Sequence, residues 1–353
     1  MNSARIPRSL LAERGASEPS AYMRVNYIES AELQPWLSSS STQPMAVTSF
    51  GQAPPCRVSC PVIVLNLPQI AGSHVCEVWT SDRPVHVTTD AGISTAVNGE
   101  YLIGSISLDE KPGLSLDAIA YRGYREILGR LQDWGYPYLW RVWNYFPGIN
   151  EDQDGLERYR RFCVGRYQAL SETLYGFPFS LPAATAVGTQ AGPLQVMFLA
   201  GTRPATHIGN PRQVNAYEYP SEYGPRSPSF ARATLLQSDQ DNLLFIAGTA
   251  SIVGHTSRHA GRPDEQTRES VHNLQAVLKQ AASMAGADTF GMTGHAMYKV
   301  YVRDCRDLGA IRSMLERSPL PFHHPLFLQG DLCRKELLVE IEGLILAQHE
   351  DCP

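Results

Sequence analysis

The stretch Asp331-Leu-Cys-Arg-Lys-Glu-Leu-Leu-Val-Glu-Ile-Glu-Gly-Leu-Ile-Leu346 ends in a run with the composition of a buried β-strand. Leu, Val and Ile dominate it from residue 337 onward, as in strands that are covered on both faces. Two carboxylates, Glu340 and Glu342, interrupt the run two residues apart, and such residues share one face of a strand. A carboxylate in apolar surroundings is costly unless it faces a cleft or a partner. The pattern therefore leaves two interpretations, an exposed sheet face that carries Glu side chains or a face that lines a site.

An internal repeat surrounds this strand. The first copy is expected to contain a strand at 98–108, a helix at 118–134, an aromatic strand at 138–146, a helix at 155–170 and strands near 183–187 and 194–200. The second copy has strands and helices in the same order at 241–252, 265–285, 296–302, 306–317, 325–330 and 337–346. Two like units predict two domains that pack into one sheet system. Aligning the copies places Phe198 opposite Glu340, so only one copy carries an acid at this position.

Composition divides the chain into four regions. Residues 1–45 are rich in Ser, Ala, Pro and Gln, which is typical of a mobile tail that ends in an early edge element. We expect an N-terminal domain over 46–205 and a C-terminal domain over 241–353. Between them, residues 206–240 combine several Pro, Tyr and Arg residues, which favours a structured loop that carries binding groups.

The overall composition is that of an ordinary globular protein, with 353 residues, of which 43% are hydrophobic and 18% charged. The net charge of -5 gives no basic footprint for nucleic acid. Seven cysteines without a CxxC pair indicate reduced thiols. The N-terminus lacks the apolar core of a secretion signal, and no apolar run of about 18 residues is present to span a membrane. We expect a cytoplasmic protein.

The sequence offers weak support for metal or nucleotide chemistry. His255 and His259 are four residues apart, which on a helix would place both on one face. Gly254, Gly261 and Pro263 predict a loop there instead. Glycine-rich phosphate-binding motifs are also missing from the sequence.

Several longer motifs of the chain follow known patterns. In the second repeat, the motifs Phe245-Ile-Ala-Gly248 and Leu338-Val-Glu-Ile-Glu-Gly343 resemble the pattern of the RidA (YjgF) family. Further motifs are Arg141-Val-Trp-Asn-Tyr-Phe-Pro-Gly-Ile-Asn150, Gly155-Leu-Glu-Arg-Tyr-Arg-Arg-Phe-Cys-Val-Gly-Arg166, Tyr223-Gly-Pro-Arg-Ser-Pro-Ser-Phe-Ala-Arg232 and Gly248-Thr-Ala-Ser-Ile-Val-Gly-His255. These further motifs resemble the chorismatase family, in which units similar to RidA are fused in one polypeptide. The likeness extends from about residue 95 to 345, and the first 90 residues add little to it.

The resemblance implies an α+β fold of two fused RidA-like repeats with a mixed-sheet, pseudo-oligomeric architecture. It also implies an enzyme that cleaves the enolpyruvyl ether of chorismate to pyruvate and 3-hydroxybenzoate, with 4-hydroxybenzoate as a further product. No metal or organic cofactor is implied. Free RidA-like units associate as trimers, and fusion replaces part of that assembly, so we expect a monomer or a weak homo-oligomer.

Three alternatives remain open. One is a chorismate hydrolase that forms a dihydroxycyclohexadiene carboxylate. The second is an imine hydrolase of the RidA type, which leaves the loop at 206–240 without a role. The third is a ligand-binding protein that kept the fold without the chemistry, since a fold alone does not define a function.

Protonation of the enolpyruvyl methylene requires a carboxylic acid that keeps its proton near neutral pH. An apolar strand raises the pKa of a carboxyl group in this way. The family's catalytic glutamate corresponds to Glu340, for which the resemblance implies the role of general acid. We expect Glu342 to be an ordinary paired or solvated carboxylate.

A substrate with two carboxylates requires fork-shaped cationic donors, which arginine supplies. Arg166 and Arg226 are the candidates because both lie in family-like motifs. Tyr159 and Tyr217 are candidates for hydrogen bonds to a carboxylate or to the ring hydroxyl. For each of the four, a surface ion pair or a core position is the alternative.

Four further residues are candidates for the pocket. Asn144 and Tyr145, at the end of the aromatic strand, are expected to form its walls. Ala247 and Cys333 correspond to positions at which subtypes of the family differ. Cys333 resembles the hydroxybenzoate-forming subtypes and Ala247 the hydrolytic one, so the pattern leaves the product open. We expect Cys333 to shape the pocket as a buried thiol, with a nucleophilic role as the alternative.

Overall fold

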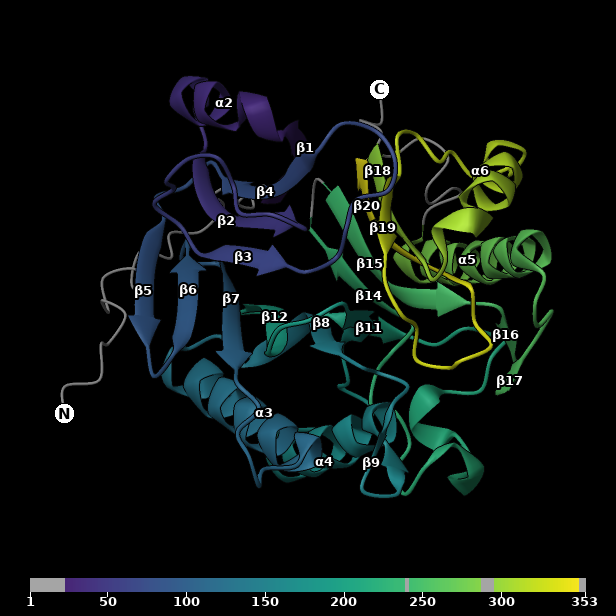
Figure 1. Cartoon of the computed structure of the whole chain (residues 1–353). Coiled ribbons are helices and arrows are strands. Elements are labelled where there is room, and N and C mark those ends of the chain that lie inside the picture. Colours follow the sequence, from purple (N-terminus) through teal and green to yellow (C-terminus); the bar gives the residue numbers. More distant parts are fainter. Residues whose placement is uncertain (1–22, 239–240, 287–294, 349–353) are drawn as a thin grey trace.

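Three β-sheets surround a common centre, and helices cover their outer faces (Figure 1). The protein is represented by a computed structural model that describes residues 23–238, 241–286 and 295–348. The arrangement confirms the expected mixed α+β fold. No helix in these residues is long and apolar enough to cross a membrane.

The middle sheet has the strand order β11-β8-β12-β7-β6-β5. Its strands are β5 (His86–Asp90), β6 (Ile93–Val97), β7 (Tyr101–Leu108), β8 (Tyr138–Pro147), β11 (Ala183–Thr189) and β12 (Leu194–Gly201). Two helices, α3 (Leu116–Asp133) and α4 (Arg158–Thr173), cover its outer face, and a short hairpin of β9 (Asp152–Gln153) and β10 (Leu156–Glu157) precedes α4.

The third sheet has the order β13-β14-β15-β20-β18-β19. Its strands are β13 (Thr206–Ile208), β14 (Ala233–Gln237), β15 (Asp241–Ala250), β18 (His295–Val302), β19 (Leu326–Gln329) and β20 (Val339–Gln348). The helices α5 (Pro263–Ala285) and α6 (Leu308–Glu316) cover it, and the hairpin of β16 (Ile252–Val253) and β17 (Thr256–Ser257) extends from β15. Helix α5 begins with a proline and ends at Gly286, whose φ of 67° suits a left-handed cap.

The internal repeat is confirmed strand by strand. In both sheets the chain runs through two antiparallel strands, a helix, a strand, a helix and two closing strands, and the last strand inserts between the second and third. The pairs β8–β11 and β18–β19 are parallel, whereas the other neighbours are antiparallel. The predicted alignment of Phe198 with Glu340 also holds, because each of these side chains contacts a glycine of the neighbouring strand, Gly104 or Gly248.

A third, shorter version of the unit precedes these two. The N-terminal sheet has the order β1-β4-β2-β3, with β1 (Met23–Glu29), β2 (Gln43–Phe50), β3 (Val62–Leu65) and β4 (Val75–Ser81). A short helix, α2 (Leu33–Ser39), follows β1 in the place that α5 takes after β15. The strands β2 and β3 are parallel, as β18 and β19 are. The chain therefore brings together three related sheets rather than two.

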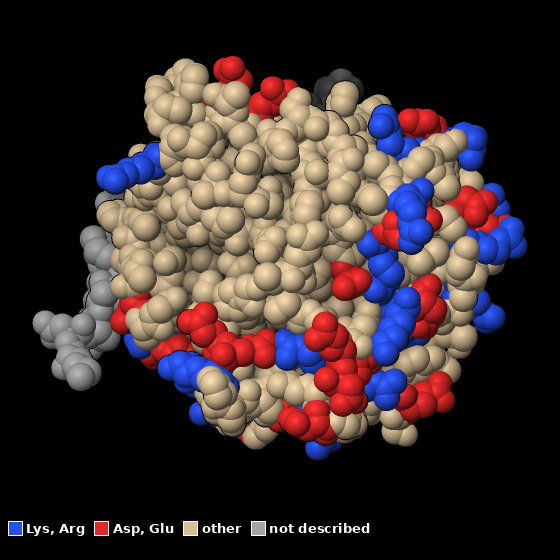
Figure 2. Space-filling model, viewed as in Figure 1, with Lys and Arg blue, Asp and Glu red and all other residues tan. Residues whose placement is uncertain are grey.

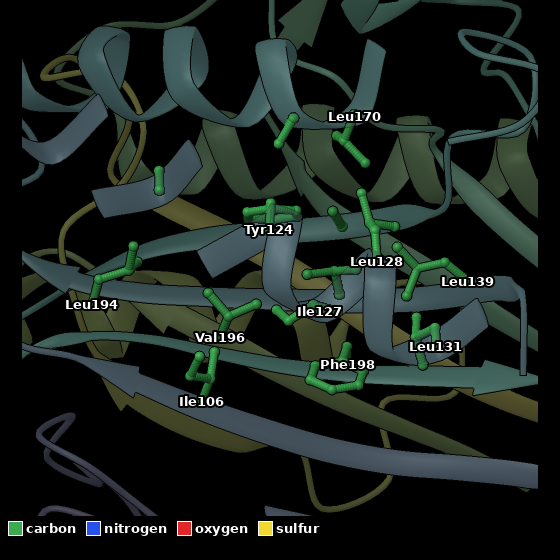
Figure 3. Close-up of a cluster of buried hydrophobic side chains, with 14 of the residues drawn as sticks. Ile106, Tyr124, Ile127, Leu128, Leu131, Leu139, Leu170, Leu194, Val196 and Phe198 are labelled. Carbon is green, nitrogen blue, oxygen red and sulfur yellow. The ribbon is translucent and has the colours of Figure 1, made fainter. Parts of the chain in front are cut away.

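Strand burial follows from this arrangement, since each sheet is covered by helices outside and by the other sheets inside. Figure 3 shows the outer core of the middle sheet, where Ile127 and Leu131 of α3 lie above Val196 and Phe198 of β12. A second core, at the centre, takes side chains from all three sheets, including Phe50, Trp143 and Phe245. This two-sided burial explains the continuous apolar runs of β8 and β20.

A buried ion network joins the three sheets at the centre. Lys299 of β18 lies 2.7 Å from Glu77 of β4 and 3.2 Å from Glu342 of β20. Arg141 of β8 lies 2.8 Å from the other oxygen of Glu342, and the Trp143 indole donates to this carboxylate at 3.0 Å. Two cations and two anions balance, which makes the burial of these charges tolerable.

Two regions differ from the expected division of the chain. Residues 23–45 contain β1, which is the expected edge element, together with α2 and the start of β2, and they belong to the N-terminal sheet; residues 1–22 lie outside the described part. The segment 206–240, expected as a loop, carries β13 and β14 at its ends, and only 209–232 runs between strands. Short strands separated by Pro and Ser gave no clear periodicity in either region.

Candidate active site

A pocket lies where the middle and third sheets meet, and it holds the carboxyl group of Glu340. Its floor comes from β11, β15 and β20, and its walls come from α4, the segment 219–232 and the turn before β20. Four of the nine residues expected from the sequence line it, namely Tyr159, Arg166, Cys333 and Glu340. The pocket therefore combines residues of both repeats.

Glu340 is only 4% exposed, and it faces Ala250 of β15 on one side and Tyr301 of β18 on the other. The strand β15 has a bulge between Ile246 and Thr249, next to this carboxyl. Burial, followed by repulsion from Glu342, raises the pKa of Glu340 to about 8, although nearby arginines oppose the shift. Within the described chain, no hydrogen bond or ion pair reaches its carboxyl group. Glu340 thus has the character of a neutral carboxylic acid at pH 7.

Glu342, two residues on, has the opposite character. Burial opposes its charge, but Lys299 and Arg141 outweigh that effect and hold the pKa of the Glu342 carboxyl below its usual value. The structure confirms the expectation of a paired carboxylate at Glu342. Two like residues on one strand face are therefore separated into an acid and a carboxylate by their surroundings.

Two buried guanidinium groups line the same pocket. Arg166 of α4 is 4% exposed, and its Nε and Nη2 atoms have no hydrogen-bond partner among the described residues. Arg232 is also 4% exposed, and its Nε has no partner there, while its Nη2 donates to the Tyr219 hydroxyl at 2.6 Å. Buried donors without partners are costly. Both groups are therefore suited to receive anionic ligand groups.

Arg226, expected beside Arg166, does not line the pocket. It is exposed, and its guanidinium lies 4.7 Å from the centre of the Tyr167 ring on the surface. Arg232, at the end of the same sequence motif, lines the pocket instead. The motif was informative, but its spacing did not show which arginine turns inward.

The tyrosines divide in a similar way. Tyr159 lines the pocket, and burial raises the pKa of its phenol well above the usual value, so it is a neutral donor. Tyr217 lies outside, edge-on to Phe179 at 6.5 Å. Tyr219 and Tyr223, which sequence reasoning did not single out, line the pocket in its place.

The pocket lining also includes Arg334. The guanidinium of Arg334 lies 4.1 Å from the centre of the Tyr223 ring, and its Nη1 donates to the carbonyl of His255 at 2.9 Å. The Tyr223 hydroxyl is 3.1 Å from Nδ1 of His255. His255 is thus part of the rim. On the face seen in Figure 2, surface charges of both signs alternate along the lower and right sides, whereas Arg166 and Arg232 are buried.

Asn144 and Tyr145 lie behind the pocket rather than in its wall. Asn144 accepts a hydrogen bond from the Tyr124 hydroxyl at 2.5 Å and donates to the carbonyl of Thr185 at 2.9 Å. Tyr145 points to the central core, where its hydroxyl is 3.1 Å from that of Tyr301. Neighbouring residues of a strand face opposite sides, so the two residues were unable to share a pocket wall.

Ala247 and Cys333 also differ in position. The side chain of Ala247 is buried in the central core, while its neighbour Gly248 lines the pocket. Cys333 lines the pocket, and burial, followed by the nearby Glu340, raises the pKa of its thiol to about 12. Such a thiol is uncharged at neutral pH and is a poor nucleophile.

Sequence and structure comparisons agree on the family. Residues 77–200 match the family described as Chorismatase FkbO/Hyg5-like, N-terminal. A 3-hydroxybenzoate synthase of Streptomyces hygroscopicus is 34% identical over 294 residues, which cover 81% of this chain and 86% of that protein. A chorismatase of the same organism is 39% identical over 282 residues, which cover 76% of this chain and 78% of that protein. A crystal structure of a chorismatase covers 93% of this chain and 100% of its own, with 32% identity and a TM-score of 0.83. The chain belongs to the chorismatase family of enzymes.

Proposed function

We propose that the protein cleaves the enolpyruvyl ether of chorismate to pyruvate and 3-hydroxybenzoate, with Glu340 as the general acid. Glu340 protonates the enolpyruvyl methylene, and the carbon that bears the ether oxygen becomes an oxocarbenium-like centre. The ring hydroxyl attacks this centre and loses its proton, which forms a cyclic ketal. One ring C–O bond then breaks, and pyruvate leaves with that oxygen as its ketone oxygen. The protons released from the hydroxyl and from a ring C–H go to the phenol oxygen and back to Glu340, and the ring becomes aromatic. No water is consumed in this route, since the atoms of chorismate divide between pyruvate and hydroxybenzoate.

The observation that carries the proposal is the state of Glu340. It is a buried acid in a pocket, and burial raises its pKa to about 8, so it holds its proton at neutral pH. General acids are most effective when their pKa lies near the working pH. Once Glu340 has given its proton to the substrate, its carboxylate lies beside the cationic centre. The negative charge of this carboxylate stabilises the centre until the ring hydroxyl attacks it.

The two buried arginines support the choice of substrate. Chorismate has two carboxylates, one on the ring and one on the enolpyruvyl group, and Arg166 and Arg232 each have a donor without a partner in the described residues. Charge-assisted hydrogen bonds from arginine are among the strongest in proteins. Tyr159, Tyr219 and Tyr223 supply further donors around the pocket.

The choice of product depends on whether water reaches the oxocarbenium-like centre before the ring hydroxyl does. The neutral thiol of Cys333 adds a weakly polar wall to the pocket and offers no activated nucleophile. This favours 3-hydroxybenzoate, and 4-hydroxybenzoate is a minor product of the same proposal. A chorismate hydrolase that forms a dihydroxycyclohexadiene carboxylate is the alternative.

Incubation of the purified protein with chorismate, followed by mass spectrometry against hydroxybenzoate and dihydrodiol standards, tests the proposal. We expect equal amounts of pyruvate and hydroxybenzoate from the wild type and neither from Glu340→Gln. Pyruvate with a dihydrodiol would contradict the ring-hydroxyl route but keep the substrate. Chorismate that stays intact with the wild type would contradict the enzymatic function.

We also propose that the chain acts as a cytoplasmic monomer that keeps an N-terminal and a C-terminal repeat as its main domains. The three sheets bury their inner faces against one another within a single chain, including Phe50, Trp143 and Phe245. A second chain is therefore not needed to cover a sheet. Solution scattering should give the mass of one chain, and a trimer would contradict the proposal.

A further inference from the structure

Thr185 of β11 is a buried polar residue of the pocket floor, and its hydroxyl group accepts two hydrogen bonds. Its Oγ1 accepts from the backbone N–H of Gly248 at 3.0 Å and from Nη2 of Arg141 at 2.6 Å. The hydroxyl also helps to lower the pKa of the Glu342 carboxyl. One side chain of the first repeat therefore meets the bulge and the ion network of the second.

Each of the two groups that donate to Thr185 lies near Glu340. The carboxyl of Glu340 packs on Gly248 so closely that a Cβ there would overlap with Oε1. Arg141 lies close enough to act electrostatically on the Glu340 carboxyl. A backbone N–H or a guanidinium that donated to this carboxyl would favour its ionised form. Thr185 occupies both donors, which leaves the carboxyl against the CH₂ group of a glycine.

We propose that Thr185 is a positioning residue, which holds the Gly248 N–H and the Arg141 guanidinium away from the Glu340 carboxyl. Thr185 keeps Glu340 free of hydrogen-bond donors, so that the acid stays protonated. The consequence for catalysis rests on the proposed function, whereas the protonation of Glu340 is measurable without substrate. Thr185 does not itself take part in the reaction.

The position of Thr185 is fixed from a second side. Its carbonyl accepts from Nδ2 of Asn144, and Oδ1 of Asn144 accepts from the Tyr124 hydroxyl. The Tyr124 ring lies 5.3 Å from the guanidinium of Arg166. Thr185 is thus anchored to the part of the pocket that holds Arg166, which gives Asn144 a supporting role.

Other charged and titratable groups also act on Glu340, and two of them, Arg141 and Glu342, interact with Thr185 as well. Those that face it from the surrounding elements are Glu342 of β20, Arg141 of β8, Arg303 and Tyr301 of β18 and its end, Tyr159 and Arg166 of α4, Arg232 before β14, and Cys333 and Arg334 before β20. A shift on substitution of Thr185 is therefore attributable to the groups that its hydroxyl contacts, namely Gly248, Arg141 and Glu342.

The test is a titration of the Glu340 carboxyl by infrared difference spectroscopy in the wild type, Thr185→Val and Thr185→Ser. Subtracting the spectrum of the matching Glu340→Gln protein isolates the C=O band of this one group. We expect Thr185→Val to titrate about one pH unit or more below the wild type, since a released donor favours the carboxylate. Thr185→Ser keeps the hydroxyl and should titrate with the wild type.

An unchanged midpoint in Thr185→Val, or an equal shift in Thr185→Ser, would overturn the proposal. If Thr185→Val does not fold, Thr185→Ala takes its place, because it also removes the hydroxyl acceptor. Its titration midpoint should shift in the same direction. The fall of kcat at high pH should move with the midpoint. A shifted midpoint in a protein that leaves chorismate intact would refute the proposed function and support the role of Thr185.

Discussion

The carboxyl group of Glu340 lies directly on Gly248, so closely that a Cβ at this glycine would overlap with Oε1. The same relationship recurs in the first repeat, where a Cβ at Gly104 would overlap with the ring of Phe198. One glycine thus makes room for an apolar ring and the other for an acid. The repeats share their architecture, and the residue on the glycine decides which of them carries the acid.

Gly248→Ala should abolish most of the activity while the protein stays folded. The methyl group must displace the Glu340 carboxyl, and a displacement of about 1 Å from the working geometry costs on the order of 100-fold in rate. Steady-state turnover of chorismate measures the loss. Gly104→Ala is the matched control, which should lower the melting temperature through its clash with Phe198 without a comparable loss of kcat. Full activity in Gly248→Ala would refute the close contact.

Glu340→Gln should be more stable than the wild type at alkaline pH. The folded pKa of Glu340, about 8, lies above its ordinary value of 4.5, so the folded state holds the proton more tightly than the unfolded state. The stability that the Glu340 proton contributes is fully present below about pH 4.5 and is lost as the pH rises through about 8. Melting temperatures at pH 5 and 9 test this. The gain of the variant should grow with pH, and an equal difference at both would contradict the raised pKa.

Arg232→Gln should lower kcat/KM by about 10- to 100-fold, which corresponds to the loss of one charge-assisted hydrogen bond. Arg226→Gln is the matched control, because Arg226 is exposed and lies over the Tyr167 ring outside the pocket. Its kcat/KM should equal that of the wild type. Equal losses in both variants would contradict the assignment of Arg232 as the inward-facing arginine.

Lys299→Met should destabilise the fold by about 3–5 kcal/mol, because it leaves Glu77 and Glu342 buried without their shared cation. Urea unfolding measures the change. Glu172→Gln, which removes an exposed pair with Arg125, should unfold at nearly the same urea concentration as the wild type. A loss in Lys299→Met as small as that of the control would show that the network contributes little to the assembly of the three sheets.

The sequence alone was sufficient for most strands and helices of the two longer repeats, because these have a clear apolar period and a recognisable end, but not for β13 and β14. It suggested strands in the N-terminal region but did not show that they form a third copy of the unit, because helix α2 spans only seven residues and Pro and Ser separate the strands. The role of Glu77 was therefore not predicted either, although this residue supplies one of the two anions of the central network. A short element that is stabilised by tertiary contacts leaves a weak local pattern.

The candidate site was predicted at Glu340, Arg166, Tyr159 and Cys333 and misplaced at its edges. Tyr217 and Tyr219, like Arg226 and Arg232, occur within one irregular segment, where no period indicates which side chain turns inward. Local spacing is informative in strands and helices but not in a segment of turns. Thr185 carried no signal either, since a threonine in a strand is common and its role depends on a glycine from the other repeat.

The most direct test of the account is the rate of a single turnover of chorismate between pH 6 and 10, for the wild type and Glu340→Gln. If Glu340 delivers the proton, the wild-type rate is constant to about pH 8 and then falls tenfold per pH unit, because only the protonated acid reacts. The variant should be slower by about 100-fold or more below pH 8. A wild-type rate that stays constant to pH 10, or a variant as fast as the wild type, would contradict Glu340 as the general acid.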